Sequence, residues 1–257
     1  MKDLCSRETV ESLASKYLAT TFYKKTADAR REKIWKPKAK IIKDIIKKEN
    51  AEDFHIIDIG GGYGIFAEEM KKYSSNPINI IEPAPHLAKL CRQKGFNVVE
   101  KFLQDVIIKD LPNKAKCFVS FELFEHLHSP HEFLKNLNNL MMPNDIFIFT
   151  TLSGTGLDIQ VLWENSPSVS PPHHLNFFNP ESIKIILKRR GFECDDVTTP
   201  GKLDIDILNN NKEHVKDRFW KAFLKTSDEK VKKKWQLLVT DSGWSSHMMV
   251  LCKKYKI

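Results

Sequence analysis

Four closely spaced glycines follow an apolar run, and their spacing suits the binding of a nucleotide-like cofactor. The run at residues 55–59 includes Asp58, and Gly60, Gly61, Gly62 and Gly64 come directly after it. Side chains at these positions would block both a tight turn and the close approach of a ligand to the backbone. The pattern therefore predicts a ligand-binding turn between a buried strand and a helix, a feature that several cofactor classes share.

A second acid stands at the end of the next apolar run. Glu82, followed by Pro83, comes after residues 78–81 and lies 24 residues beyond Asp58. A carboxylate at this place can accept hydrogen bonds from both ribose hydroxyls of an adenosine. The acid fits a dinucleotide as well as other adenosine-bearing cofactors.

The glycine spacing departs from the dinucleotide pattern GxGxxG. Counted from Gly60, Ile65 takes the place of the last glycine, whereas counting from Gly62 puts Ala67 there, which the loosest form of the pattern accepts. A nicotinamide cofactor therefore remains an alternative at this point.

Strand-like and helix-like stretches alternate from about residue 54 onward. Apolar runs at 55–59, 78–81, 98–100, 117–121 and 146–150 alternate with helical stretches that include 65–73, 86–94 and 130–140. A loop at 153–178, a helix at 180–190, a strand at 192–197, a helical insertion at about 205–239 and a strand at 247–252 follow. The order predicts a doubly wound, mostly parallel α/β sheet, which binds ligands at the carboxyl ends of its strands.

We expect one domain over residues 1–257. It would comprise an N-terminal helical segment at 1–52 with helices at 8–22 and 36–48, a core at 53–200, a helical insertion at 201–242 and a final strand at 243–257. The two helical parts would form a lid over the sheet edge.

Three segments, in the same order, resemble class I S-adenosylmethionine-dependent methyltransferases. Residues 58–64 resemble their acid followed by a GxGxG-type turn, and residues 118–130 resemble the fourth strand and turn of the ubiquinone-biosynthesis O-methyltransferase group. Residues 140–152 resemble the fifth strand, with Asn144 and Asp145 in place of the usual glycines. The resemblance covers about residues 56–152 and implies a seven-stranded Rossmann-like fold with S-adenosylmethionine as cofactor.

The resemblance also implies roles for single residues. Gly60, Gly62 and Gly64 would face the methionine part of the cofactor, Glu82 with Pro83 would hold the ribose, and Phe121 would line the site. Asp58 would orient the turn or the ammonium group, unless it only bonds to the local backbone. For the adenine we expect Asp105, which follows the third strand together with Phe102 and Gln104.

Methyl transfer to a hydroxyl requires a base, and histidine is the usual base near neutral pH. His173 and His174 lie in the proline-containing segment at residues 170–178, between the fifth strand and the next helix. Either one is a candidate for the base, with His174 preferred. The alternative is that they only brace the loop through hydrogen bonds.

Glu122, Glu125 and His126 form an ExxEH motif. If the segment begins a helix, this spacing places the three side chains near one face. The group resembled here implies a metal at this motif, and two carboxylates with one imidazole favour Mg²⁺ over Zn²⁺. A structural brace is the alternative.

Charge and cysteine content restrict the partners. The chain of 257 residues has 41 Lys and Arg against 33 Asp and Glu, a net charge of +8, but the basic residues are scattered. This excludes a concentrated nucleic-acid footprint and favours an anionic small molecule. Five widely spaced cysteines and the lack of an apolar run of about 20 residues indicate a cytoplasmic protein without a membrane span.

We therefore expect an O-methyltransferase for a small polar acceptor, such as a sugar or a nucleotide-linked precursor of a surface polysaccharide. The alternatives are an NAD-dependent oxidoreductase and a non-catalytic cofactor-binding subunit. Aromatic residues would pack the core or lid or wall a substrate pocket: Phe22, Tyr23, Trp35, Trp163, Phe177, Trp220 and Trp244. Neither the acceptor atom nor the oligomeric state follows from the sequence.

Overall fold

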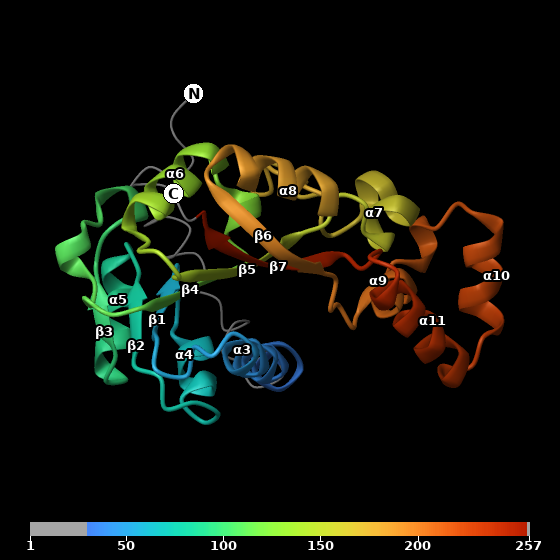
Figure 1. The fold of residues 1–257 in the computed structure, drawn as a ribbon. Helices are drawn as coiled ribbons and strands as arrows, with labels where there is room; N and C mark the ends of the chain where they lie inside the picture. The colour runs from blue at the N-terminus through green and yellow to red at the C-terminus, as the bar shows by residue number, and fades with distance from the viewer. Residues whose placement is uncertain (1–29, 256–257) are drawn as a thin grey trace. The chain divides into compact units, whose positions relative to one another are not determined.

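The strands form one seven-stranded sheet in the order β3-β2-β1-β4-β5-β7-β6, in a computed structural model that describes residues 30–255 (Figure 1). They are β1 (His55–Ile59), β2 (Ile78–Ile81), β3 (Asn97–Val99), β4 (Lys116–Phe121), β5 (Ile146–Leu152), β6 (Phe192–Thr198) and β7 (His247–Lys254). Strand β1 pairs in parallel with β2 and β4, and β2 with β3. The predicted doubly wound, mostly parallel sheet is confirmed.

The longer helices precede β1 or connect the strands. They are η1 (Arg31–Trp35), α3 (Lys36–Lys48), α4 (Ile65–Met70), α5 (Pro85–Gln93), α6 (Pro130–Leu140), α7 (Leu157–Leu162), α8 (Pro180–Arg189), α9 (Asp204–Asn210), α10 (Arg218–Thr226) and α11 (Glu229–Asp241). Single turns of 3-10 helix are η2 (Leu103–Asp105), η3 (Ile108–Asp110), η4 (Phe124–His126), η5 (Trp163–Asn165) and η6 (Lys212–His214). The helix predicted at residues 36–48 is present, whereas the one predicted at 8–22 lies outside the described residues.

The chain divides into two compact units. Among the described residues, unit 1 contains 30–120, 128–148 and 253–255, and unit 2 contains 121–127 and 149–252. Between residues 30 and 255, no helix combines the length and the apolar composition needed to cross a bilayer.

The core of unit 1 is built from strands that are buried on both faces. Ile56, Ile57, Ile80 and Phe118 have no exposed surface, as expected for near-continuous apolar runs in a parallel sheet. Helix α3 packs on α4, and α5 packs on β3. Figure 1 shows α3 and α4 below these strands and α6 above them.

The structure of the turn before β5 explains why Asn144 and Asp145 can stand where the enzymes that the sequence resembles have glycines. Asn144 has a φ of 72°, a left-handed conformation that asparagine tolerates better than most residues. Asp145 is fully buried, and its carboxylate accepts hydrogen bonds from the backbone N–H groups of Met142 (2.8 Å) and Lys116 (2.7 Å). The buried ammonium of Lys116 lies 3.4 Å from the same carboxylate. Asp145 thus ties the beginning of β4 to the turn that leads into β5.

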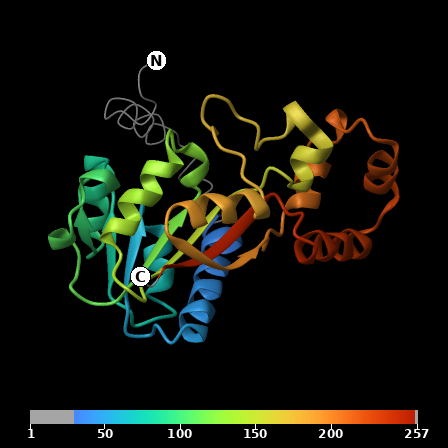
Figure 2. The same ribbon diagram turned by 45° about the horizontal axis from the view of Figure 1, so that its top comes forward.

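Helices α7, α9, α10 and α11 have a hydrophobic core of their own within unit 2. It contains Leu157, Leu162, Ile205, Leu208, Val215, Phe223, Leu224 and Val239. Figure 2 shows the orange and red helices of this group beyond the ends of β6 and β7. The sequence indicated an uninterrupted loop at residues 153–178. That prediction is wrong at α7, whose apolar residues become helical because this second core buries them.

We expect Asp145→Ala to lower the free energy of unfolding by about 3 kcal/mol, because it leaves two backbone N–H groups without an acceptor and the buried ammonium of Lys116 without its negative partner. Urea unfolding monitored by circular dichroism measures the change. The matched control is Asn144→Gly in the same turn, which keeps the left-handed backbone and should change stability by less than about 0.5 kcal/mol. Equal losses in the two variants would contradict this role of Asp145.

Candidate functional site

The glycine turn of unit 1 lies between β1 and α4. Gly62 and Gly64 have φ angles of 54° and 68°, values at which any other side chain is strained. Gly61 is required for a different reason, because a Cβ there would lie 2.6 Å from Cγ2 of Ile80 on the neighbouring strand. Gly60 donates its N–H to the carbonyl of Ile81 (2.8 Å), which fixes the turn to the end of β2.

Glu82 holds the same turn from the end of β2. Its carboxylate accepts one hydrogen bond from the N–H of Gly62 (2.8 Å) and one from the N–H of Ala84 (2.9 Å). Burial raises the pKa of Glu82, and the two backbone hydrogen bonds oppose that rise. The carboxylate therefore lies at the turn, as the resemblance implies for the group that holds the ribose, and Pro83 beside it is half-buried.

Asp58 is buried at the end of β1, and its Oδ2 atom has no hydrogen-bond partner among residues 30–255. Burial, with the Glu82 carboxylate nearby, raises the pKa of Asp58 to about 7. A buried acceptor without a donor costs free energy unless a ligand supplies one. The residues at the turn fit the S-adenosylmethionine that the resemblance implies: its ammonium group would supply the missing donor for Asp58, and its ribose hydroxyls would suit Glu82.

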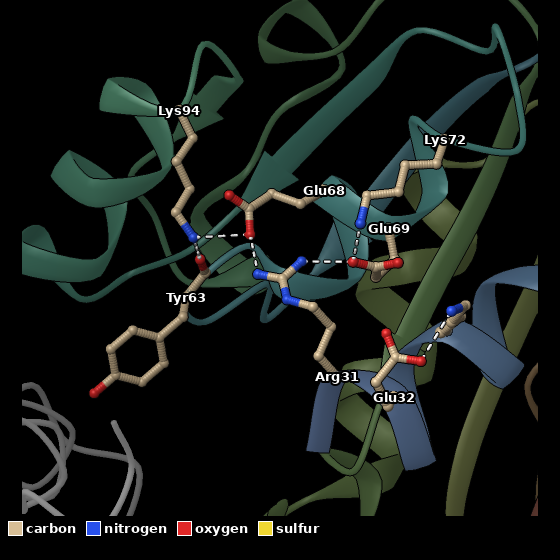
Figure 3. A network of polar contacts seen from close by, with 8 residues as sticks. Arg31, Glu32, Tyr63, Glu68, Glu69, Lys72 and Lys94 are labelled. Carbon is tan, nitrogen blue, oxygen red and sulfur yellow. Dashed lines mark hydrogen bonds and ion pairs between the residues drawn. The ribbon is translucent and has the colours of Figure 1, made fainter. Parts of the chain in front are cut away.

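A network of charged residues connects the turn at Tyr63 with Glu68 and Glu69 in the second half of α4 (Figure 3). The ammonium of Lys94 donates to the carbonyl of Tyr63 (2.7 Å) and lies 3.2 Å from the carboxylate of Glu68. Arg31 bridges Glu68 (2.8 Å) and the buried Glu69 (2.6 Å), as the dashed lines in Figure 3 mark. The network joins η1, α4 and Lys94, which directly follows α5, and it fixes the turn at Tyr63.

The other residues predicted to bind the cofactor are placed as follows. Asp105 ends η2 and is exposed, as is Gln104, whereas Phe102 is half-buried. Phe121 is buried at the end of β4 and belongs to unit 2. Their contacts with the cofactor stay predictions.

A second group of chemically competent side chains lies in unit 2. Glu125, His126 and His174 each offer one ligand atom, and these atoms lie within 4.8 Å of one another. The rings of His126 and His174 have their centroids 4.9 Å apart. The sequence placed Glu125 and His126 near one face if the segment began a helix, but η4 is a single 3-10 turn. The third residue of the cluster comes from the loop at residues 166–178, between η5 and α8, which we call the histidine loop.

Backbone carbonyls orient both histidine rings of this cluster. Nδ1 of His126 lies 2.8 Å from the carbonyl oxygen of His173, and Nδ1 of His174 lies 2.7 Å from that of Ser168. Since a carbonyl only accepts, each Nδ1 donates, and the lone pair of each neutral ring is on Nε2. Burial lowers the pKa of His126, which favours its neutral form.

Glu125 connects the two segments of the cluster. Its buried carboxylate accepts from the hydroxyl of Thr151 (2.9 Å), and its carbonyl accepts from the N–H groups of Leu175 (2.8 Å) and Asn176 (3.1 Å). Burial, together with the carboxylate of Glu122, raises the pKa of Glu125. These bonds hold the histidine loop against the turn that follows β4.

Glu122 has other partners in the structure. It has a φ of 51°, and its carboxylate accepts from the hydroxyl of Thr150 (2.7 Å) and lies 3.1 Å from Nε2 of His247. The helical spacing considered for residues 122–126 is therefore wrong. No local pattern predicts Thr150 and His247 as partners, because both contact Glu122 only through the tertiary arrangement of distant strands. His173 is exposed, and its carbonyl rather than its ring contacts the cluster.

Two of the predicted pocket aromatics line a cavity of about 720 Å³ within unit 2. Trp220 and Trp244 share its wall with Trp235, and Lys216 and Asp217 contribute polar groups. The rings of Trp220 and Trp235 also pack on each other, with centroids 5.5 Å apart. Aromatic faces with a few polar groups are typical of small-molecule sites.

Comparison with known proteins identifies the family. Residues 23–197 match the model of the methyltransferase domain. No curated protein matches the sequence. Since the family model covers more than half of the chain, the protein belongs to the methyltransferase family.

Solved structures with the same fold include a putative sarcosine dimethylglycine methyltransferase from Galdieria sulphuraria, with 13% identity, 85% of each chain covered and a TM-score of 0.57. A SAM-dependent methyltransferase from Archaeoglobus fulgidus has 18% identity, with 84% of this chain and 94% of that chain covered and a TM-score of 0.53. Geranyl diphosphate methyltransferase in complex with SAM has 9% identity, 92% coverage of each chain and a TM-score of 0.60.

The family and the fold together define the class of protein. It is an S-adenosylmethionine-dependent methyltransferase of class I, as the resemblance implied. The nicotinamide alternative finds no support in the family match.

We predict that the affinity for S-adenosylhomocysteine rises with pH until about pH 7 and is constant above it. Asp58 is half-protonated near pH 7 in the free protein, and pairing with the ligand's ammonium requires its ionised form. Below this pKa the affinity should therefore fall by about tenfold per pH unit. Isothermal titration calorimetry over about pH 5.5 to 8 measures this affinity for S-adenosylhomocysteine.

Two variants isolate the contribution of Asp58. Asp58→Asn should bind more weakly and lose the pH dependence, because no carboxylate titrates at that position. Glu82→Gln should also weaken binding but move the midpoint to lower pH, because the neighbouring negative charge is gone. An affinity of the wild-type protein that is independent of pH would contradict a contact between Asp58 and the ammonium.

Proposed function

We propose that the protein is an O-methyltransferase for a small polar acceptor, and that the cluster of Glu125, His126 and His174 activates the acceptor hydroxyl. The observation that carries the proposal is the orientation of His174: its Nδ1 donates to the carbonyl of Ser168, so that Nε2 is the basic atom. A nitrogen acceptor would not require such a base to the same degree.

The proposed step transfers one methyl group. The acceptor hydroxyl gives its proton to Nε2 of His174 while its oxygen forms a bond to the methyl carbon, and the bond between that carbon and sulfur breaks. The bound cofactor supplies the electrophilic methyl group and leaves as S-adenosylhomocysteine. The protein's own residues orient the base and hold its tautomer, which is the usual contribution of such groups.

A sugar or a nucleotide-linked sugar is the acceptor class that we propose, with a role in making a surface polysaccharide. The net charge of +8 favours a phosphate-bearing acceptor over a neutral one. The resemblance to the ubiquinone-biosynthesis O-methyltransferase group supports oxygen as the acceptor atom, and the basic balance argues against a lipid quinone. We also propose a cytoplasmic location, since the five cysteines are widely spaced.

A panel of sugar phosphates and nucleotide sugars tests the acceptor class, with S-adenosylmethionine carrying a ¹³C-labelled methyl group. Nuclear magnetic resonance of the product distinguishes a methyl group on oxygen from one on nitrogen or carbon. We expect an O-methyl signal from at least one phosphorylated sugar. A methyl signal on nitrogen or carbon alone would contradict O-methylation.

We predict that His174→Ala lowers the rate of methyl transfer by about 10² or more, the usual contribution of a general base, and leaves the affinity for S-adenosylhomocysteine unchanged. His173→Ala is the matched comparison, because the exposed ring is removed while its carbonyl stays on His126. Rates measured with the acceptor found above decide between the two. If only His173→Ala lowers the rate, the base is His173 and this role of His174 is wrong.

A divalent ion is the alternative means of activation, favoured by the approach of three ligand atoms in the cluster. The donors would be Glu125, His126 and His174 in place of Glu122, which is engaged with Thr150 and His247. Two imidazoles and one carboxylate suit Zn²⁺ better than the Mg²⁺ expected from the sequence. The ion would occupy Nε2 of His174, so the two roles exclude each other.

Chelation distinguishes the two roles. With His174 as the base, we expect exhaustive dialysis against a chelator to leave the rate of methyl transfer unchanged. A loss of activity that one divalent ion restores, together with one bound ion per chain by metal analysis, would contradict His174 as the base and favour activation by the ion.

A further inference from the structure

Asp158 on α7 is a buried acid outside the groups described so far. It has no exposed surface, and its Oδ2 atom accepts hydrogen bonds from the hydroxyls of Ser166 and Ser168, both at 2.5 Å. The hydroxyl of Ser166 also accepts from the N–H of Ser168 (3.0 Å). One carboxylate oxygen thus holds three consecutive residues of the loop in a closed arrangement.

The same loop segment is hydrogen-bonded to His174, the proposed base. The carbonyl of Ser168 accepts the hydrogen bond from Nδ1 of His174 (2.7 Å), and the N–H of His174 donates to the carbonyl of Ser170 (3.0 Å). The direction in which Nε2 points therefore depends on where the carbonyl of Ser168 lies. That position is set by the hydrogen bonds of Ser168 to Asp158 and Ser166.

The backbone before α7 restricts Asp158 from the other side. A Cβ at Gly156 would lie 3.1 Å from Oδ1 of Asp158 and 2.6 Å from Cα of Ser246. Oδ1 itself has no hydrogen-bond partner among the described residues. Burying a carboxylate with one unpaired oxygen costs free energy. The hydrogen bonds that Asp158 accepts from Ser166 and Ser168 fix this loop, which an apolar side chain of the same size would not do.

We propose that Asp158 is a positioning residue for His174: it fixes the 166–168 segment, whose carbonyl selects the tautomer and the direction of the imidazole. This inference rests on the proposed function only for its consequence in catalysis. The tautomer itself is a property of the protein without cofactor or acceptor.

The tautomer of His174 tests the proposal directly. Long-range ¹H–¹⁵N correlation spectra of the full ¹⁵N-labelled chain, recorded near pH 8 where neutral imidazoles dominate, distinguish the Nδ1–H form from the Nε2–H form. The His174 signals are assigned as those that His174→Gln removes. We expect the Nδ1–H pattern in the wild-type protein and an averaged pattern of both tautomers in Asp158→Ala.

Asp204→Ala is the matched control. Asp204 is also a buried acid of unit 2 that accepts from two serine hydroxyls, those of Ser245 (2.7 Å) and Ser246 (2.6 Å). Among residues 30–255, its side-chain hydrogen bonds go to Gln236, Ser245 and Ser246, which lie outside the histidine loop. We expect this variant to keep the Nδ1–H pattern of His174. Averaging in both variants would indicate a general loosening of the unit and overturn the proposal.

Ser168→Ala serves as the second variant, should Asp158→Ala fail to fold. It removes one of the two hydroxyl bonds to Asp158 while its carbonyl remains, and we expect partial averaging of the His174 tautomers. An unchanged Nδ1–H pattern in the folded Asp158→Ala protein, or in Ser168→Ala if the first variant does not fold, would overturn the proposal. If Asp158→Ala averages the tautomers of His174 but leaves the rate of methyl transfer unchanged, the result supports Asp158 as a positioning residue and refutes His174 as the base.

Discussion

The hydrogen bond from the N–H of Gly62 to the carboxylate of Glu82 is the interaction on which the candidate cofactor site depends. It joins the turn after β1 to the end of β2, two strands that run in parallel with Ile59 opposite Ile81. Parallel pairing brings the carboxyl ends of both strands to the same edge. A glycine turn and an acid that are far apart in sequence thereby become parts of one site.

The same bond also contributes to the electrostatics of the site. Burial is the main cause of the raised pKa of Asp58, and the Glu82 carboxylate, which this bond keeps nearby, raises that pKa further. A ligand with a positive charge relieves the repulsion between these two carboxylates. The two acids thus favour a cationic ligand at the turn and disfavour an anionic one. This preference suits a cofactor with a sulfonium and an ammonium group better than one with a pyrophosphate.

In unit 2, hydrogen bonds to main-chain carbonyls position the residues of the cluster of Glu125, His126 and His174. The carbonyl of Glu125 accepts from two residues of the histidine loop, and the side-chain amide of Asn176 donates to the carbonyl of Leu127 (2.6 Å). Carbonyls of the loop in turn orient the rings of His126 and His174. The cluster therefore consists of two segments that hold each other largely through main-chain groups, and Nε2 of each neutral histidine carries the lone pair.

The parts of this structure that the sequence predicts are those governed by local patterns. Strand β1 has the predicted bounds because its apolar run is buried on both faces, and α6 begins at Pro130, after Ser129, which caps it through the N–H of Glu132. Helix α7 was missed because six residues are too few to show a period within a segment rich in Gly, Ser and Pro. The partners Glu122 and His247, and the bonds from Asp158 to the loop serines, depend on tertiary packing that no local spacing encodes.

Thermal unfolding with added ligand tests the central claim, that the acid pair at the glycine turn holds S-adenosylmethionine. At a concentration of about 100 times the dissociation constant, S-adenosylhomocysteine should stabilise the folded protein by about 2.7 kcal/mol and raise its Tm, whereas NAD should leave the Tm unchanged. Glu82→Ala should remove the effect, and Glu164→Ala, at an exposed acid of unit 2, should retain it. Stabilisation by NAD and none by S-adenosylhomocysteine would contradict the claim.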